Sequence, residues 1–559
     1  MNHQVRPEKL LCGGLSGKAT LLRVIVAIAF IASSSTASFS QSPEVKKALR
    51  YIDIEQPSKG ISAMEQLVSA NPTNSSYLYY LGLAQIRTGN KDKALANFEK
   101  GIALNEKDGL NHAGKGHIKL LDKNAAEAKL SLDKAVSVSK SKDANVLRAV
   151  GEAFLSDSKY LIDAFNYLNK AKGINAIDPE THILLGDAYL LQNNGGESVS
   201  SYERAAKADP KLAKPHHKVA LVYMRSRNVD IALESLNKAI TIDPEYAPAF
   251  KELGEIYYLR KEAEKAVKAY ESYLAITEKP GDARFQLAFF YFMAKNYEKA
   301  NAIFKEVLNK PDASTTALRY YAYSLVEQSK NDPTKVEEAR NIFEQYFKKA
   351  KTEDIKASDY EYYAKLLVKI PNQDSLVNEA IAKSLALDSL QPEMLQIHGD
   401  TYMKRKKYAE AVGAYKQLIA QRKQPLSQDL FAIGRAYYQN EQFPEADTAF
   451  TKLAEKQPNM TVGYLWAGRS RQHIDSTGVQ GLAKPMYEQV VEKGSQNPEK
   501  YKKDLIEAYD YLGTYHLQIT KDVTLAKGFF EKVLALDPAN ARAKEFMQTL
   551  KQPGTKGGR

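Results

Sequence analysis

The chain has 559 residues, of which 44% are hydrophobic and 26% are charged, so it is long and apolar enough to form a large folded body. The formal net charge is +12, but 79 basic and 67 acidic residues are mixed along the chain, without a basic block or an aromatic RNA-binding motif. This composition argues against an intrinsically disordered chain and against a nucleic-acid-binding protein.

Residues 1–40 have the layout of a signal peptide. Basic residues come first, an unbroken apolar run from Val24 to Ala32 follows, and small residues lead up to Ser40. The apolar run has nine residues, whereas a helix that spans a bilayer needs ~20. We therefore expect cleavage after Ser40 and a periplasmic or secreted protein. A buried helix or an uncleaved anchor remains the alternative.

The single cysteine, Cys12, lies before the apolar run, where a lipoprotein cysteine would lie after it. The mature chain would then contain no cysteine and no disulfide, which suits an oxidising compartment. No second apolar run approaches the length that a membrane span needs. We expect no membrane span in the mature chain.

One pattern recurs between residues 41 and 550, in steps that are mostly 34 or 35 residues long. A large apolar residue precedes a small one, and about twelve residues later come Ala, then an aromatic residue or Leu, then Pro. We count fourteen such small residues. They are Ala48, Gly82, Gly116, Gly151, Gly186, Ala220, Gly254, Ala288, Ala322, Ala364, Gly399, Gly434, Gly468 and Gly513.

Each repeat holds two apolar stripes with helical spacing, separated by a short polar break, which predicts two antiparallel helices. The small residue of the first helix would let the second helix approach closely. Asp-Pro pairs such as Asp209-Pro210 would end one repeat and start the next, with Asp as a cap and Pro in the first helical turn. A single helix pair cannot bury its apolar face, but stacked pairs can. We therefore predict an all-α protein, a superhelical α-solenoid of about fourteen stacked helix-turn-helix repeats.

Two longer steps divide the array. The steps from Ala322 to Ala364 and from Gly468 to Gly513 are 42 and 45 residues long, and we expect lengthened turns at 331–334 and 473–478. The predicted domains are a repeat block over 41–346, a second block with lengthened turns over 347–550, and a flexible tail over 551–559.

The sequence offers little for catalysis. The stretch from Gly13 to Thr20 differs from a phosphate-binding loop, since Cys12 takes the place of its first Gly and Ala19 that of its Ser or Thr. There is no HExxH motif, no spacing of metal ligands and no G-x-S-x-G elbow. We interpret His216 and His217 as one exposed and one buried side chain. We expect a protein that is not an enzyme, with no catalytic residue, cofactor or metal; an enzyme with unrecognised residues is the third hypothesis.

The repeat resembles the tetratricopeptide repeat family, which has a 34-residue period and the same Leu-Gly, Tyr, Ala, Phe, Ala and Pro positions. The resemblance covers roughly residues 41–550, although Leu, Phe, Tyr or His replaces the Trp of the family pattern. It implies that the first helices line a concave surface that binds protein or peptide partners. By register, this surface would include Tyr79, Leu83, Ile86, Leu465 and Arg469. The partner-binding residues predicted from it are Phe285, Phe289, Phe292, Arg319, Tyr323, Phe431, Arg435 and Tyr438.

The three Phe residues fall on one face of one predicted helix. Leu287, Ala288 and Tyr291 would fill its packing side, so we expect the three Phe side chains to be exposed or lightly covered. The competing interpretation is that neighbouring repeats bury them as core.

These features together predict a non-catalytic scaffold or adaptor in the periplasm or cell envelope of a Gram-negative bacterium. It would bind envelope proteins or peptides in a secretion, outer-membrane assembly or energy-coupled uptake system. The alternative is a glycan-binding or accessory module of an envelope enzyme, in which aromatic residues stack on sugar.

Overall fold

A computed structural model describes residues 42–310, 314–330, 332–422 and 424–550. The predicted signal peptide over 1–40 and the predicted tail over 551–559 lie outside these residues.

The described residues form 29 α-helices and no β-strand. The helices from α2 to α29 make fourteen consecutive pairs, and α30 follows as a single helix. Each of the fourteen small residues singled out in the sequence lies in the first helix of its own pair. The predicted all-α solenoid and its number of repeats are therefore confirmed.

The chain divides into two compact units, Met1–Lys310 and Pro311–Arg559. The boundary predicted between residues 346 and 347 falls inside helix α19 (Pro333–Lys349). The predicted repeat blocks thus do not coincide with the two compact units.

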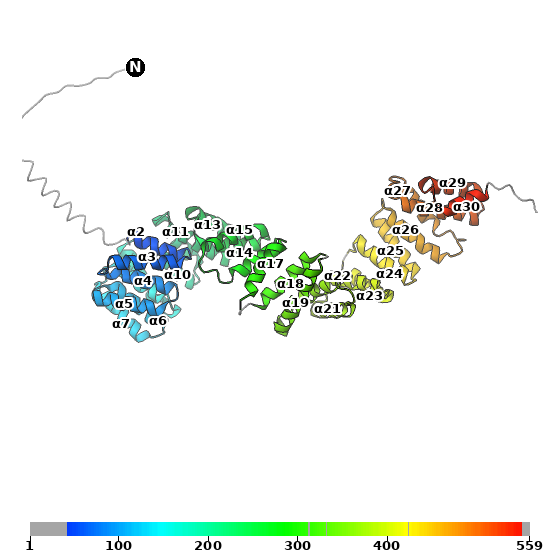
Figure 1. Cartoon of the computed structure of the whole chain (residues 1–559). Coiled ribbons are helices and arrows are strands. Elements are labelled where there is room, and N and C mark those ends of the chain that lie inside the picture. Colours follow the sequence, from blue (N-terminus) through cyan, green and yellow to red (C-terminus); the bar gives the residue numbers. More distant parts are fainter. Residues whose placement is uncertain (1–41, 311–313, 331, 423, 551–559) are drawn as a thin grey trace, which may run out of the picture. The chain divides into compact units, whose positions relative to one another are not determined.

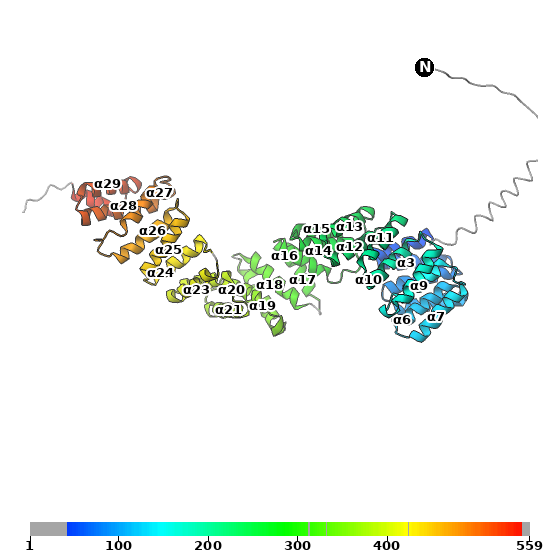
Figure 2. The same cartoon turned by 180° about the vertical axis from the view of Figure 1, so that it is seen from behind.

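The N-terminal unit contains eight helix pairs (Figures 1 and 2). Their bounds are α2 (Pro43–Asp53), α3 (Pro57–Ala70), α4 (Ser75–Arg87), α5 (Lys91–Leu104), α6 (Gly109–Leu121), α7 (Ala125–Val138), α8 (Ala144–Phe154), α9 (Leu161–Ile174), α10 (Pro179–Leu191), α11 (Gly195–Ala208), α12 (Lys214–Arg225), α13 (Val229–Ile242), α14 (Ala247–Leu259), α15 (Ala263–Ile276), α16 (Ala283–Met293) and α17 (Tyr297–Leu308), with one 3-10 turn, η1 (Ser158–Tyr160).

The C-terminal unit contains six helix pairs and α30. Their bounds are α18 (Thr315–Ser329), α19 (Pro333–Lys349), α20 (Ala357–Leu367), α21 (Asp374–Leu387), α22 (Pro392–Lys404), α23 (Tyr408–Gln421), α24 (Ser427–Gln439), α25 (Phe443–Lys456), α26 (Thr461–Ile474), α27 (Lys484–Gly494), α28 (Lys502–Tyr515), α29 (Val523–Leu536) and α30 (Ala541–Thr549), with the short helices η2 (Thr352–Asp354) and η3 (His516–Thr520).

Small residues bring the two helices of a pair together, as the sequence predicts. A Cβ atom added to Gly254 of α14 would lie 2.3 Å from Cδ2 of Tyr270 in α15. Gly82 meets Phe98 of the next helix in the same way, at 2.4 Å from Cε1. The repeated pairing of a small residue with a ring 16 positions later therefore forms the core of the repeat.

The Asp-Pro pairs Asp209-Pro210 and Asp243-Pro244 end one repeat, as expected, but they do not open the next helix. Asp209 and Asp243 are C-cap residues of α11 and α13, so they end the second helix of a repeat. The carboxylate of Asp209 accepts a hydrogen bond from the backbone N–H of Lys211 at 3.1 Å, and Pro210 lies in the turn before α12 begins at Lys214. The expectation that such a pair caps and opens the next helix is wrong here. It holds for Asp178, which is the N-cap of α10, with Pro179 as its first residue.

One of the two predicted insertions lies elsewhere. Helices α18 and α19 have 15 and 17 residues, and only residues 330–332 separate them. The extra residues thus extend the helices and the connection to α20, and the expected long turn at 331–334 is wrong; residue 331 itself lies outside the described residues. The second insertion is confirmed, because residues 475–483 form a long loop between α26 and α27.

The first repeat of the N-terminal unit packs against the seventh. Tyr273 and Thr277 each donate a hydrogen bond to the Glu55 carboxylate at 2.8 Å, and the backbone N–H of Glu278 donates to the Glu55 carbonyl at 2.9 Å. Ile54 is fully buried in a core cluster formed with residues of α12 to α15. Helices α2 to α15 therefore close into a ring, in which the blue first repeat lies beside the teal and green helices of the same unit (Figures 1 and 2).

Candidate functional site

Two surfaces on first helices are candidates for binding, one in each compact unit. In the C-terminal unit, α24 carries Phe431, Arg435 and Tyr438, three of the predicted residues, and each is at least partly accessible. Their partners lie on α26, the first helix of the next repeat. The six side chains that make up this aromatic–arginine surface are Phe431, Arg435, Tyr438, Trp466, Arg469 and His473.

Trp466 lies at the centre of the aromatic–arginine surface. Its ring meets those of Phe431 and Tyr438 edge-on, with centroid distances of 6.0 and 5.3 Å. The guanidinium of Arg469 lies 4.5 Å from the Trp466 ring centroid, and that of Arg435 lies 5.9 Å away. Two cations over one indole form cation–π contacts that hold the arginines in place.

Polar contacts fix the edges of the aromatic–arginine surface. Arg469 donates two hydrogen bonds to Glu507 of α28, at 2.7 and 2.6 Å, and this carboxylate raises the pKa of the Arg469 guanidinium although burial opposes it. The Tyr438 hydroxyl lies 2.9 Å from Nε2 of His473, and burial raises the pKa of that hydroxyl. Arg435 stays exposed. Rigid aromatic rings beside an available guanidinium are the groups that carry most binding energy at protein interfaces.

Three predicted binding residues are buried, against expectation. Phe289 is 9% exposed and packs against Tyr258 and Phe290 at centroid distances of 5.5 and 6.0 Å. Arg319 and Tyr323 are 8% and 4% exposed. The expectation that these side chains are exposed is wrong, because rings and carboxylates of neighbouring helices cover them. Phe285 and Phe292 are half-buried.

Arg319 and Tyr323 belong to a polar cluster inside the C-terminal unit. Both donate to the Asp359 carboxylate of α20, Arg319 at 2.8 Å and Tyr323 at 2.5 Å. Arg319 also donates to the Tyr346 hydroxyl at 2.6 Å. The three phenylalanines lie in the N-terminal unit and these two residues in the C-terminal unit.

The prediction of binding-face residues from the family pattern also missed residues that the structure places on the aromatic–arginine surface. Leu465 was assigned to the binding face but is buried, and its neighbour Trp466 takes that place. Trp466, Arg469 and His473 are three and four positions apart, the spacing of one helix face. That spacing around the single tryptophan was the signal in the sequence that could have identified them.

The second candidate is a cavity of about 640 Å³ inside the ring of the N-terminal unit. Tyr79 and Leu83, two of the residues that the repeat register predicts for the binding face, line this cavity. Ile86, the third of them, does not line it, whereas the adjacent Arg87 does. Residues from α2, α4 and α8 form part of the wall, together with the first turns of α10 and α12 and Tyr246, the N-cap residue of α14.

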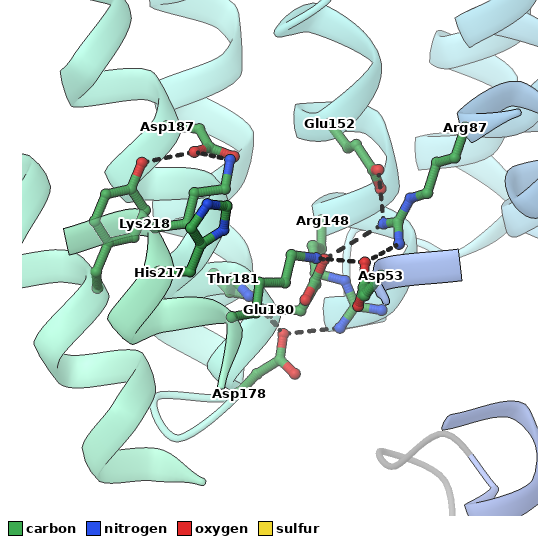
Figure 3. A network of polar contacts seen from close by, with 12 residues as sticks. Asp53, Arg87, Arg148, Glu152, Asp178, Glu180, Thr181, Asp187, His217 and Lys218 are labelled. Atoms are coloured by element: carbon green, nitrogen blue, oxygen red, sulfur yellow. Dashed lines mark hydrogen bonds and ion pairs between the residues drawn. The ribbon is translucent and has the colours of Figure 1, made fainter. Parts of the chain in front are cut away.

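Ion pairs link these helices across the cavity (Figure 3). Arg87 of α4 lies 3.2 Å from Glu152 of α8, 3.4 Å from Glu180 of α10 and 3.7 Å from Asp53 of α2. Lys214 of α12 lies 3.1 Å from Glu180 and 3.4 Å from Asp53. Arg148 adds a contact of 2.8 Å to Asp178. We call these seven residues the cavity network: Asp53, Arg87, Arg148, Glu152, Asp178, Glu180 and Lys214.

Glu180 and the three cations of the cavity network are charged at neutral pH. Burial opposes ionisation of Glu180, but Lys214, Arg87 and Arg148 outweigh it and lower the pKa of that carboxyl to about 2. The carboxylates likewise raise the pKa of Arg87 and Arg148 against the effect of burial. The network therefore satisfies its own charges and connects five repeats.

His217 lies beside the network in α12, as the buried member of the predicted histidine pair, while His216 is half-buried. Its Nδ1 lies 3.3 Å from the Tyr246 hydroxyl. Burial, with the charge of Lys218, lowers the pKa of the His217 imidazole to about 3. The ring is neutral at physiological pH.

The part of the chain that the structure describes contains no group of His, Cys, Asp and Glu side chains able to hold a metal ion. In the same residues, no helix has the length and apolar character needed to cross a membrane.

Known proteins match the chain in several parts of the repeat array. Sequence models described as tetratricopeptide repeat match residues 75–108, 179–212, 219–283, 282–313 and 398–461. The crystal structure of the C-terminal part of a TPR repeat-containing protein from Cytophaga hutchinsonii is 31% identical over 47% of this chain and 99% of that chain, with a TM-score of 0.42. The chain belongs to the tetratricopeptide repeat family.

Other similar proteins are more distant. Tetratricopeptide repeat protein 1 of Schizosaccharomyces pombe is 27% identical over 146 residues, which are 24% of this chain and only 14% of that protein. YrrB, described as a TPR protein with an unusual peptide-binding site, is 21% identical over 34% of this chain and 97% of its own, with a TM-score of 0.23. Tetratricopeptide repeat proteins are typically non-catalytic, and this chain is a protein–protein interaction scaffold.

Proposed function

We propose that this tetratricopeptide repeat protein is an exported scaffold that holds envelope proteins together in the periplasm of a Gram-negative bacterium. It would serve a secretion, outer-membrane assembly or energy-coupled uptake system. The layout of residues 1–40, basic then apolar then small, supports export.

The aromatic–arginine surface is the observation that carries the binding part of this proposal. Its aromatic rings are held by mutual contacts and by α28, so little side-chain entropy is lost when a partner binds. Exposed Arg435 lies 6.0 Å from the Phe431 ring and is available to a carboxylate or a backbone carbonyl of the partner. Rings beside arginines favour a peptide or protein over a sugar.

Site-specific photo-crosslinking in living cells tests the binding face. A photoreactive residue at Arg435, on α24, should capture envelope proteins on irradiation, whereas one at the exposed Lys452 of α25 should not. In a wild-type background without the photoreactive residue no adduct should form. Equal capture at both positions would contradict the proposal.

Two further measurements complete the test. Phe431→Ala should weaken binding of a captured partner by ~2 kcal/mol or more if this ring is an anchor. N-terminal sequencing should find Gln41 at the start of a soluble envelope protein; an intact Met1 in a cytoplasmic fraction would refute export. Binding of an envelope polysaccharide without any protein adduct would replace this function with the glycan-binding alternative.

A further inference from the structure

The ring of the N-terminal unit encloses a cavity whose wall includes the first repeat. Helix α2 supplies five residues of the cavity wall, namely Lys46, Lys47, Leu49, Arg50 and Asp53. Arg50 reaches across the joint and donates two hydrogen bonds to Asp243, at 2.8 and 2.6 Å, and one to Glu245 at 2.9 Å. The first repeat is thus both a wall of the cavity and the part that closes it.

Most charges in the wall are already paired. The three cations and four carboxylates of the cavity network are all in ion pairs with one another, and Arg50 is paired with Asp243 and Glu245. A ligand would have to break several ion pairs to use these groups, so they do not decide which charge the cavity prefers.

Unpaired charge in the cavity is mainly positive. Lys46, Lys47 and Lys211 line the cavity and are exposed at its edge, and none of them forms an ion pair within the described residues. Asp209 is the one lining carboxylate without an ion pair among the same residues, and its oxygen accepts the backbone N–H of Lys211. The whole lining has seven cations and six carboxylates, and the three lysines without an ion pair are the groups that the carboxylates of an anionic ligand can reach.

Helix direction adds to this preference. The first turns of α10 and α12 contribute to the wall, together with Tyr246, the N-cap residue of α14, so three helix N-termini face one cavity. The N-termini of α12 and α14 have no side-chain cap, so their backbone N–H groups favour negative ligands within the first turn, whereas Asp178 already caps α10. Tyr79, Leu83 and Leu212 provide apolar wall between the charges.

We propose that this cavity binds an acidic segment of a partner protein, with Lys46, Lys47 and Lys211 as its carboxylate-binding groups, and that the first repeat undocks to admit it. This proposal rests on the scaffold function proposed above and names the chemistry of one partner. An extended segment fits better than a folded domain, because a cavity of about 640 Å³ holds only a few side chains.

The test uses the purified mature chain and a fluorescein-labelled octaglutamate peptide, followed by fluorescence anisotropy at an ionic strength of about 0.15 M. Octalysine and a Gly-Ser peptide of equal length are the comparison probes. Octaglutamate should bind and the other two should not. Replacing Lys46, Lys47 and Lys211 with Gln should weaken octaglutamate binding at least about tenfold, as expected when desolvated charge pairs are lost.

A matched variant separates the site from general attraction to a basic protein. Lys93, Lys100 and Lys142 are exposed lysines of the same unit outside the cavity, and their replacement with Gln removes the same charge. This variant should change affinity less than about threefold, because exposed charges that do not contact the ligand are screened by salt. Equal losses in the two triple variants, or no binding of octaglutamate, would overturn the proposal.

A second variant tests the role of the first repeat. Arg50→Glu places a like charge against Asp243 and Glu245, so amide hydrogen exchange over α2 should accelerate and octaglutamate affinity should fall. Faster exchange with unchanged affinity would overturn the claim that the docked first repeat completes the site. These measurements do not involve the aromatic–arginine surface. If the cavity proposal failed but envelope proteins were captured at Arg435, the proposed scaffold function would still stand.

Discussion

The guanidinium of Arg319 lies against the carboxylate of Asp359, with Nε 2.8 Å from Oδ1, and the Asp359 side chain is fully buried. Burial opposes the charge on the guanidinium, but Asp359 outweighs it and raises the pKa of Arg319. Asp359 also accepts the backbone N–H of Lys356 at the start of α20, at 2.7 Å. One carboxylate thus joins α18, α19 and α20 inside the C-terminal unit.

Arg319→Met should destabilise the C-terminal unit by ~3–5 kcal/mol, because it leaves a buried carboxylate without its cation. Urea denaturation followed by circular dichroism measures the change. Arg340→Met is the matched control, since Arg340 forms only an exposed pair with Glu344 one turn away, and it should cost less than ~1 kcal/mol. Similar midpoints for the two variants would show that the Asp359 cluster carries little stability.

Gly254→Ala should destabilise the N-terminal unit by ~1–3 kcal/mol, because its new methyl group overlaps the Tyr270 ring. Gly173→Ala adds the same methyl group at an exposed position of α9, where no atom lies within 4 Å. This control should be neutral or raise stability by ~0.5–1 kcal/mol, since alanine favours helix over glycine. Thermal melts of both variants compare the two sites, and a control that melts lower than Gly254→Ala would refute the packing argument.

Phe289→Ala should cost ~3–5 kcal/mol of stability, because the ring is buried against Tyr258 and Phe290. Met293→Ala, at an exposed position of the same helix, should change stability by less than ~0.5 kcal/mol. A stable Phe289→Ala variant that no longer binds partners would restore the original view of this ring as a binding residue.

Acidification from pH 7 to pH 5 should destabilise the N-terminal unit through His217. Its folded-state pKa of about 3 lies below the unfolded value of 6.5. The stability that the neutral, buried His217 ring allows is fully present above pH 6.5. It is lost as the pH falls from 6.5 toward 3, because in this range only the unfolded state takes up the proton. At pH 5 the loss should be roughly 2 kcal/mol.

His217→Phe should remove most of this pH dependence in denaturation curves recorded at pH 7 and pH 5. Glu180 gives no comparable slope in this range, since its folded-state pKa is about 2. If the wild type and His217→Phe lost the same stability between the two pH values, another group would be responsible.

The sequence pattern predicted the helix pairs well, because the small residue and the ring that covers it lie in one repeat. Gly254 and Tyr270 are 16 positions apart, within reach of a period of 34 or 35 residues. All fourteen first helices were located in this way.

Exposure on the first helices could not be predicted with the same success, because it depends on neighbouring repeats. The residue that neutralises Arg319 lies 40 positions further on, and the ring that covers Phe289 belongs to Tyr258 of the preceding repeat. Leu465 and Trp466 are neighbours in the sequence, yet Leu465 is buried and Trp466 is partly exposed, because adjacent residues of a helix point in different directions. The docking of Glu55 on Tyr273 has no counterpart in the repeat pattern at all.

That docking joins residues 218 positions apart. In an open array, an end repeat has a single neighbour and frays first when the protein is heated. Here the first repeat has neighbours on both sides, so its helices should melt together with α14 and α15 and not ahead of them. The contact between the first and seventh repeats can form only after residue 278 is available. It is therefore a late folding step that joins residues far apart in the sequence, whereas the rest of the array folds through local contacts.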